Sequence, residues 1–393
     1  MFARCHSPHL FLKLTAATFV PNSTRGKSRT QCPHLSHPHV SHESPPRFLF
    51  RLATEIGGPV ERLWGSFTKS GDENALRVTY QMAETLRPLL LGLDRDTPIV
   101  ATHSLVGLIA VSCGFTNVIN LVIDNHAQWF IVVPGALNLV QGPTNYHSLL
   151  RMGVPAHELQ LAGAWIPRDL VEGLESDCRA RQQRARDRKP ARLLIPVGGA
   201  GAQRSFVTTL VTALKQKLLR GEVQLFLNAG DHEHMRDAFL GAIETLGTPY
   251  TVVDSLDGVR SFAQRLREGH EPEEAVTLFA FADYFPAVAT TDLLARVTDL
   301  LCCKPSELAF YPVPKLMIRR VGDHEAYSAL RASEMGDGTL ELREMSDALA
   351  YVELIRQPDL LVQMNESIIT NAKGGLYDGC KRAIEIATAR CKL

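Results

Sequence analysis

Apolar residues along this chain gather in short continuous runs that alternate with longer amphipathic segments. Between Thr97 and Leu150, Asp124 is the only acidic or basic residue apart from histidines. The pattern there predicts three elements, a strand at Ile99–Ala101, a helix at Leu105–Cys113 that ends at Gly114, and a strand at Val118–Ile123. Polar residues interrupt the run too often for a membrane span, which needs about 20 predominantly apolar residues. Apolar strands of this kind are typical of a parallel sheet covered by helices on both faces.

The second half of the chain repeats this rhythm. A helix is predicted where apolar residues recur four apart, at Phe206, Leu210, Leu214 and Leu218, with its end at Gly221. Strands are predicted at Leu193–Val197, Val223–Leu227, Tyr250–Val253, Val276–Phe281, Leu300–Cys303 and Lys315–Ile318. Two successive α/β units favour two Rossmann-like domains that face each other across a cleft.

Shifts in composition divide the chain into five predicted segments. They are an N-terminal segment over residues 1–48, a first Rossmann-like domain over 49–177, a basic linker over 178–192, a second Rossmann-like domain over 193–370 and a C-terminal helix over 371–393. The basic run from Arg179 to Arg192 lacks an apolar period and is interpreted as a solvated helix end, with a phosphate or anionic-lipid contact as the alternative. The last segment is expected to cross back and pack on the first domain. Glycines at 374, 375 and 379 would allow the crossing, and Ala383, Ile384, Ile386 and Ala387 would form the apolar face.

The first 48 residues differ from the rest of the chain. They hold six of the 14 histidines, and six basic residues against the single acid Glu43. An acid-poor, Ser-rich, basic N-terminus resembles an organellar transit peptide, although a translated stretch upstream of the true start would look the same. The prediction is a disordered or cleaved segment, with a plastid or mitochondrial location if it is a transit peptide. Otherwise the expected location is cytoplasmic with peripheral membrane contact.

Composition narrows the function classes. Lys+Arg and Asp+Glu both number 42, so the net charge is zero, which argues against bulk nucleic-acid binding. Eight cysteines without a CxxC pair exclude a disulfide scaffold and most zinc modules, and they favour a reducing compartment. No cofactor or resident metal is expected.

A glycine turn is the first candidate binding element. Gly198, Gly199, Ala200 and Gly201 follow a predicted strand and open a helix, where backbone N–H groups can approach an anion. Gln203 and Arg204 would add donors in the first helical turn. The alternative is a bare turn between strand and helix, because position 204 of the GxGxxG pattern is not glycine.

Two further candidates follow later strands. Lys304, Ser306 and Glu307 come after the strand that ends at Cys303, where the Glu307 carboxylate could accept from a ribose diol or, alternatively, favour a helix N-terminus. His324 and Glu325 follow the next strand, and the same helix-start alternative applies to them. The cluster Asp231-His232-Glu233-His234 looks like a metal site, but its side chains are neighbours in sequence and point in different directions.

Taken in order, these segments resemble two-domain glycosyltransferases that use nucleotide sugars, in the branch of monogalactosyldiacylglycerol synthase and the bacterial lipid II-forming transferase. The resembling segments are a strand ending at Asp124, then Trp129, Met152-Gly153-Val154-Pro155, Leu161–Pro167, the glycine loop at 196–201, Asp292–Ala295, Asp299–Leu301, Glu307 and His324-Glu325. The resemblance spans roughly residues 97 to 340 and implies a GT-B-like fold. It also implies a UDP-linked sugar substrate, a hexose transfer to a lipid or small-molecule acceptor, and ribose binding at Glu307. His103 and His126 are the candidate bases because both lie near the carboxyl ends of predicted strands of the first domain, although either could instead be a core histidine.

Three departures from this branch stand out. Its opening strand and glycine-histidine loop have no match here, and Lys304-Pro305 runs into Ser306-Glu307 without the usual glycines. Ser328 stands where the branch usually has Asn. Two alternatives therefore stay open, a sugar-nucleotide 2-epimerase and a catalytically impaired binding or scaffold protein.

Overall fold

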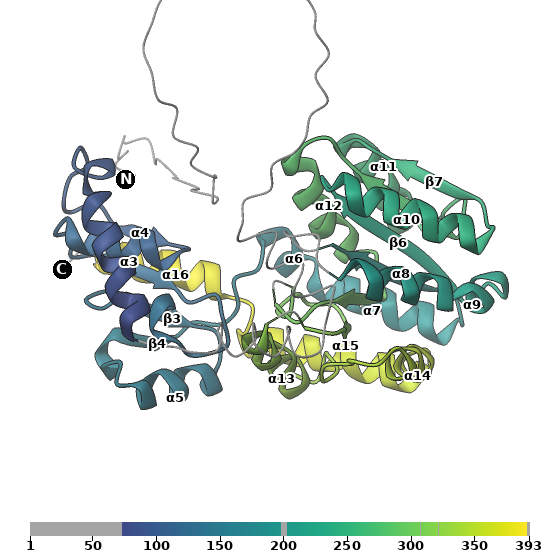
Figure 1. Cartoon of the computed structure of the whole chain (residues 1–393). Coiled ribbons are helices and arrows are strands. Elements are labelled where there is room, and N and C mark those ends of the chain that lie inside the picture. Colours follow the sequence, from purple (N-terminus) through teal and green to yellow (C-terminus); the bar gives the residue numbers. More distant parts are fainter. Residues whose placement is uncertain (1–72, 198–202, 307, 321, 391–393) are drawn as a thin grey trace, which may run out of the picture. The chain divides into compact units, whose positions relative to one another are not determined.

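The computed structural model describes residues 73–197, 203–306, 308–320 and 322–390. Within these residues the chain forms two separate parallel sheets, so the prediction of an α/β chain with two parallel-sheet units is confirmed (Figure 1). The expected absence of an opening strand concerns residues before Glu73, which lie outside the described part. No described helix is long and apolar enough to span a bilayer.

The first sheet has four parallel strands in sequential order, β1 (Ile99–Ala101), β2 (Val118–Leu121), β3 (Leu137–Val140) and β4 (Leu159–Leu161). The elements around it are α3 (Glu73–Thr85), η1 (Arg87–Leu89), α4 (Ser104–Ser112), η2 (Trp129–Ile131), α5 (Pro143–Met152) and η3 (Ala156–Glu158). Leu108 and Ala110 of α4 pack with Val118, whereas Leu149 of α5 packs with Val140 and Leu159. The predicted strands β1 and β2 and the helix α4 are confirmed. The short strands β3 and β4 were not predicted.

The second sheet has six parallel strands in the order β10-β9-β5-β6-β8-β7. Their bounds are β5 (Ala191–Pro196), β6 (Val223–Gly230), β7 (Tyr250–Val253), β8 (Val276–Ala280), β9 (Leu300–Cys303) and β10 (Lys315–Met317). All six strands were predicted, with ends that differ by at most a few residues. Their alternate side chains enter two cores because a strand points successive residues to opposite faces. On one face lie Leu194, Phe226, Phe279 and Leu301, and on the other lie Leu193, Leu225, Leu278 and Leu300.

Helices cover both faces of this second sheet. Their bounds are α6 (Arg168–Glu172), α7 (Leu174–Arg186), α8 (Arg204–Ala213), α9 (Lys215–Leu219), α10 (Glu233–Leu246), α11 (Leu256–Arg267), α12 (Tyr284–Ala295), η4 (Asp323–Glu325), α13 (Ala326–Glu334), α14 (Met345–Ile355) and α15 (Pro358–Lys373). The face of Leu194 packs against α7, α11 and α12, and the face of Leu193 packs against α8, α10 and α14. The helix predicted through Phe206 and Leu218 is two helices, α8 and α9, because the chain turns at Leu214.

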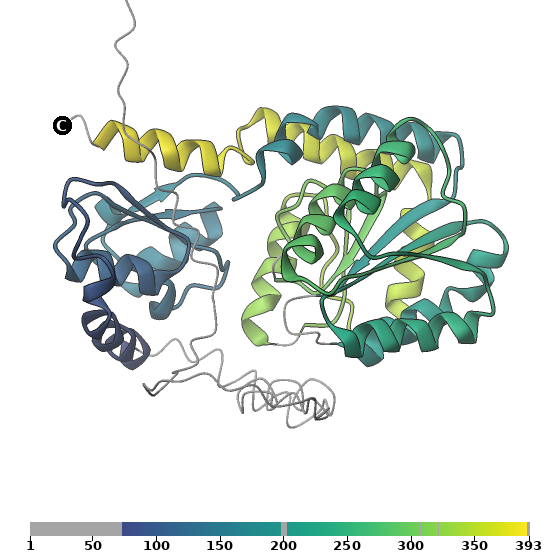
Figure 2. The same ribbon diagram turned by 90° about the horizontal axis from the view of Figure 1, so that it is seen from above.

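The basic stretch predicted as a linker is largely the helix α7. Arg181 is buried there, and its guanidinium donates to the carbonyl oxygens of Thr298 (2.7 Å), Ala295 (2.7 Å) and Pro312 (3.2 Å). α7 also lies alongside α15, where the Gln182 side chain donates to Val362 O at 3.3 Å (Figure 2). The basic stretch lacks an apolar period because Arg181 occupies a core position of α7. Its guanidinium is tolerated there because carbonyl oxygens accept its hydrogen bonds.

The chain returns from the second sheet to the first through α16 (Gly379–Arg390). Ala383 and Ala387 of this helix pack with Ile119 and Leu139 of the first sheet. The crossing is tight, because a Cβ added at Gly379 would lie 2.4 Å from Ala164 O.

Candidate functional site

The strand order of the second sheet places a topological switch point between β5 and β9, at the carboxyl edge of the sheet. From β5 the chain proceeds to β6 on one side, and after β8 it crosses to β9 on the other side of β5. The connections that leave β5 and β9 therefore diverge, and open parallel sheets bind ligands in the crevice at such a switch point. The residues that follow β5, β9 and β10 are consequently the ones placed to bind a ligand.

An ion pair joins the segments that follow β9 and β10. Lys304 comes directly after β9, and its Nζ lies 2.8 Å from Oε1 of Glu325, in η4 after β10. The Glu325 side chain is 4% exposed and the Lys304 side chain 15% exposed. A buried carboxylate without a partner would be costly, so Lys304 both stabilises Glu325 and fixes its orientation.

Three polar atoms at this edge are buried and have no hydrogen-bond partner in the described structure. They are Nε2 of Gln203, Oγ of Ser306 and Nδ1 of His324, which follow β5, β9 and β10 respectively. Gln203 precedes α8 in a left-handed conformation (φ 71°), which is uncommon for a residue other than glycine. Buried polar atoms normally have partners, since leaving one unsatisfied costs about 1–3 kcal/mol. These three atoms are therefore available to hydrogen-bond a ligand.

The loop after β2 of the first sheet contacts the segment after β10. Asn125 donates through Nδ2 to Ser328 Oγ at 3.2 Å, and the ring centroids of His126 and Tyr327 lie 4.5 Å apart. Asn145 of α5 fixes the loop by donating to the carbonyl oxygen of Asp124 at 2.5 Å. The neighbours of the Lys304–Glu325 pair thus include side chains from the first sheet.

Asp124 is electrostatically linked to three of these groups. Burial raises the pKa of the Asp124 carboxyl and the neighbouring Glu325 raises it further, whereas His324 and His126 lower it. Gln128 also lowers this pKa by donating to Oδ2 at 3.5 Å. Burial is the largest effect, so the pKa of Asp124 lies above its ordinary value. A carboxylate with a raised pKa accepts a proton more readily than an ordinary one, which is what a general base requires.

The structure brings together part of the predicted site. Lys304, His324, Glu325 and His126 lie in one group with Asp124. Gln203 and Ser306 lie at the carboxyl ends of adjacent strands on the same edge.

The other predicted residues stand apart or lie outside the described part. His103 is exposed and caps α4, because its Nδ1 accepts from Leu105 N at 3.2 Å. Four residues of the glycine turn, at positions 198–201, and Glu307 lie outside the described residues. Among the residues that are described, no three His, Cys, Asp or Glu side chains are placed to hold a metal ion.

Sequence reasoning overlooked Asp124 as a site residue. Its signal was present, since Asp124 is the only charged residue in a long apolar stretch and follows a predicted strand. What the sequence could not provide was the proximity of its carboxyl to Glu325, which is 201 residues further along the chain.

Two family models match different parts of the chain. Residues 154–388 match a family model described as "Domain of unknown function (DUF6938)", and residues 64–151 match another described as "Domain of unknown function (DUF6937)". No significant match was found among curated proteins.

Solved structures give weak resemblances. Anabaena Alr3699/HepE in complex with UDP and glucose is 14% identical over 80% of this chain and 82% of its own, with a TM-score of 0.42. A UDP-forming α,α-trehalose-phosphate synthase from Burkholderia vietnamiensis is 12% identical over 87% of this chain and 80% of its own, with a TM-score of 0.39. TM-scores this low carry no weight for activity. The DUF6938 model covers more than half of the residues, and the chain therefore belongs to the family described as "Domain of unknown function (DUF6938)".

Proposed function

We propose that this protein is a glycosyltransferase that transfers a hexose from a nucleotide sugar, UDP-linked in the first instance, to a lipid or small-molecule acceptor. The observation that carries the proposal is the carboxyl edge at the switch point. Unpartnered buried atoms of Gln203, Ser306 and His324 lie there beside the Lys304–Glu325 pair. A nucleotide sugar offers phosphate oxygens and sugar hydroxyls, which match donors such as Gln203 Nε2 and acceptors such as Glu325.

The proposed reaction uses these groups in separate roles. The bond between the anomeric carbon and the diphosphate oxygen breaks, and the acceptor hydroxyl oxygen bonds to that carbon. The leaving diphosphate takes the electron pair and is stabilised by the donors that follow β5 and β9. The proton of the acceptor hydroxyl passes to Asp124 or His126, which lie in the loop after β2. Of these two groups Asp124 is preferred, because burial and Glu325 raise its pKa.

The choice of a lipid as acceptor rests on the sequence resemblance. The basic run from Arg179 to Arg192 gives it limited support, because Arg181 and Arg192 are both buried and bonded inside the fold. Exposed cations remain at Arg186 and Lys189 for a peripheral membrane contact. The organellar location likewise stays a proposal from the N-terminal composition.

Ligand-dependent thermal stabilisation tests the proposal directly. The full chain is melted with UDP-, GDP- and ADP-sugars, and a rise in Tm with one nucleotide class is expected. Lys304→Met should weaken the binding of that nucleotide sugar tenfold or more, because it removes the cation that lies 2.8 Å from the buried Glu325 carboxylate. Lys381→Met is the matched control, because it removes a lysine from an exposed ion pair in which Lys381 Nζ lies 4.0 Å from Glu385 Oε1.

A second assay separates catalysis from binding. Release of the free nucleoside diphosphate in the presence of an acceptor is expected from the wild type and should fall at least 100-fold in Asp124→Asn, within the usual range for loss of a general base. Stabilisation without release would favour a binding or scaffold protein, and interconversion of sugar nucleotides without acceptor would favour an epimerase. If no nucleotide sugar raises the Tm, the proposal is wrong.

A further inference from the structure

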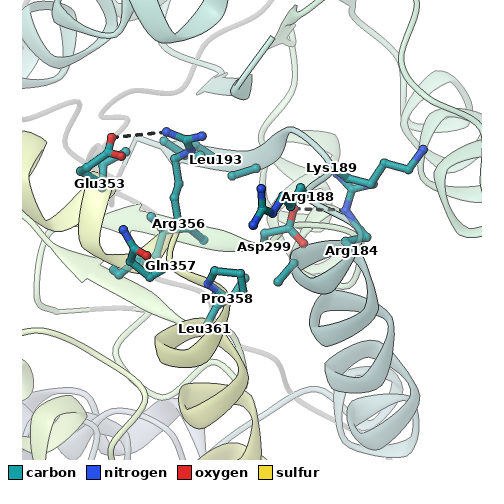
Figure 3. Close-up of a pocket in the computed structure, with 15 residues that line it drawn as sticks. Arg184, Arg188, Lys189, Leu193, Asp299, Glu353, Arg356, Gln357, Pro358 and Leu361 are labelled. Carbon is teal, nitrogen blue, oxygen red and sulfur yellow. Dashed lines mark hydrogen bonds and ion pairs between the residues drawn. The ribbon is translucent and has the colours of Figure 1, made fainter. Parts of the chain in front are cut away.

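A cavity of about 270 Å³ lies at the edge of the second sheet opposite to the candidate site. Its walls come from the start of β5 at Ala191, the start of β9 at Asp299 and Leu300, and the last turn of α7. The junction between α14 and α15, at Arg356 to Pro358, closes it (Figure 3). Because all six strands are parallel, their amino ends lie away from the carboxyl edge described above, so this cavity is a separate feature.

Arg188 supplies a guanidinium to this cavity. Its backbone is left-handed (φ 52°), and Lys189 N donates back to Arg184 O at 3.0 Å to end α7. Glycine is the usual residue at such a helix end, so arginine is not selected there by the backbone. The structure gives its guanidinium no ion pair or hydrogen bond among the described residues. In Figure 3 the Arg188 side chain extends into the middle of the lining residues, whereas Lys189 points away from them.

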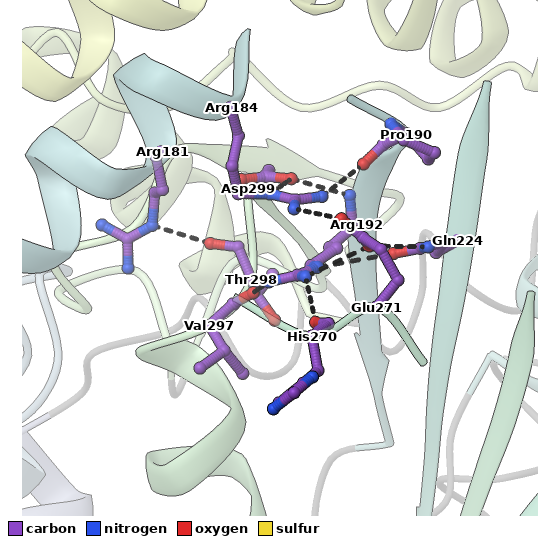
Figure 4. A network of polar contacts seen from close by, with 10 residues as sticks. All are labelled: Arg181, Arg184, Pro190, Arg192, Gln224, His270, Glu271, Val297, Thr298 and Asp299. Carbon is purple, nitrogen blue, oxygen red and sulfur yellow. Dashed lines mark hydrogen bonds and ion pairs between the residues drawn. The ribbon is translucent and has the colours of Figure 1, made fainter. Parts of the chain in front are cut away.

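Asp299 supplies a fixed hydrogen-bond acceptor to the same cavity. The residue is 3% exposed, and its Oδ2 accepts from Arg192 N (2.9 Å) and from Arg184 Nε (3.2 Å). These bonds belong to a network that also contains Gln224 and Glu271 (Figure 4). Asp299 Oδ1 is buried and has no partner in the described structure. Asp299 Oδ1 therefore lacks a hydrogen-bond donor, and the Arg188 guanidinium does not donate to it.

The charges of the lining favour an anion that also carries hydroxyl groups. Four cations, Arg184, Arg188, Lys189 and Arg356, line the cavity together with two acids, Asp299 and Glu353. Arg356 is partly neutralised by Glu222 at 2.7 Å. Arg188 is therefore the cation most available to a phosphate group, while Asp299 Oδ1 requires a donor such as a hydroxyl. The volume lies slightly below the range of about 300–1,000 Å³ that is usual for drug-sized ligands.

We propose that this cavity binds a small phosphorylated sugar or polyol. Its phosphate bonds to the Arg188 guanidinium, and one of its hydroxyl groups donates to Asp299 Oδ1. The proposal does not depend on the activity proposed above, because it uses none of the residues at the carboxyl edge.

Calorimetric titration of the full chain tests this site with three probes: glucose 6-phosphate, glucose and inorganic phosphate. Saturable binding of glucose 6-phosphate is expected, with inorganic phosphate and glucose each bound at least tenfold more weakly. The absence of saturable binding up to about 10 mM glucose 6-phosphate would overturn the proposal. Inorganic phosphate bound as tightly as the sugar phosphate would overturn the contact to Asp299.

The variant Arg188→Gly separates binding from folding. Glycine suits the left-handed position, so the Tm should stay the same or rise, while glucose 6-phosphate should bind at least tenfold more weakly. Arg188→Lys should recover part of the affinity. Arg186→Gln is the control, since Arg186 is exposed in the last turn of α7 and does not line the cavity. Unchanged affinity in Arg188→Gly would overturn the proposal.

Discussion

An ion pair between Lys315 and Asp337 is completely buried in the second sheet. Both side chains are 0% exposed, and Lys315 Nζ lies 2.8 Å from Asp337 Oδ2. Lys315 also donates to the carbonyl oxygens of Tyr311 (2.8 Å) and Val313 (3.1 Å), and Tyr377 donates its hydroxyl to Asp337 Oδ2 at 3.3 Å. Lys315→Met therefore leaves a carboxylate in the interior whose one remaining side-chain donor among the described residues is Tyr377. We predict a large loss of stability.

The magnitude follows from the separation of the two charges. At 2.8 Å and an effective dielectric constant of about 20, their attraction is about 6 kcal/mol, part of which offsets the desolvation of both groups. Removing one partner of a buried pair costs about 3–5 kcal/mol, and we expect this loss in the free energy of unfolding of Lys315→Met. Urea denaturation measures it as a lower midpoint at similar slope. The control Lys381→Met removes an exposed pair and should cost less than about 1 kcal/mol.

The pH dependence of this variant gives a second check. Burial raises the pKa of Asp337 and Lys315 lowers it, with burial the larger effect. A raised folded-state pKa favours the folded protein below the unfolded pKa, and this gain is lost as the pH rises through the folded pKa. Without Lys315 the pKa rises further, so the penalty of Lys315→Met should shrink as the pH falls from about 7 towards the unfolded value of about 4. A penalty that is independent of pH, or no larger than that of Lys381→Met, would refute the reasoning.

Three further predictions address packing, the proposed donor site and catalysis. Gly379→Ala should lower the free energy of unfolding by about 1–3 kcal/mol in a urea titration, because the new Cβ would lie 2.4 Å from Ala164 O. The control Gly241→Ala, in α10, should raise it by up to about 1 kcal/mol, because no atom lies within 4 Å of the added Cβ. Glu307→Gln should weaken nucleotide binding by about 30- to 1,000-fold if this carboxylate binds a ribose, and should cost at most about 1 kcal/mol of stability with binding intact if it only favours a helix start. If Asp124 is the base, kcat/KM should fall as the pH drops through its raised pKa, and a profile without an acidic limb would contradict that role.

The fold was largely predictable because its longer strands are continuous apolar runs. Runs such as Leu300–Cys303 and Tyr250–Val253 stand out between turn residues and match β9 and β7 residue for residue. The three-residue strand β4 escaped because so short a run has no period. The segment of α7 was misread for another reason, since Arg181 occupies a core position that only hydrogen bonds to carbonyl oxygens make tolerable.

Half of the candidate site was predictable by the same logic. Residues that follow strands of one sheet meet at its carboxyl edge, so Gln203, Lys304 and Glu325 could be chosen from their place after predicted strands. Asp124 belongs to another sheet, and its proximity to Glu325 depends on how the loop after β2 meets η4 and α13. No pattern along the chain encodes that distance.

The return of α16 to the first sheet affects how this protein is made. Ala383 and Ala387 cover Ile119 and Leu139, and Asn117 donates through Nδ2 to Ala387 O at 2.9 Å, across 270 positions of sequence. During translation the first sheet emerges early, but its covering helix is synthesised only after the whole second sheet. The face of the first sheet that α16 covers therefore stays open to water and to chaperones throughout that interval, which makes it prone to aggregation during synthesis.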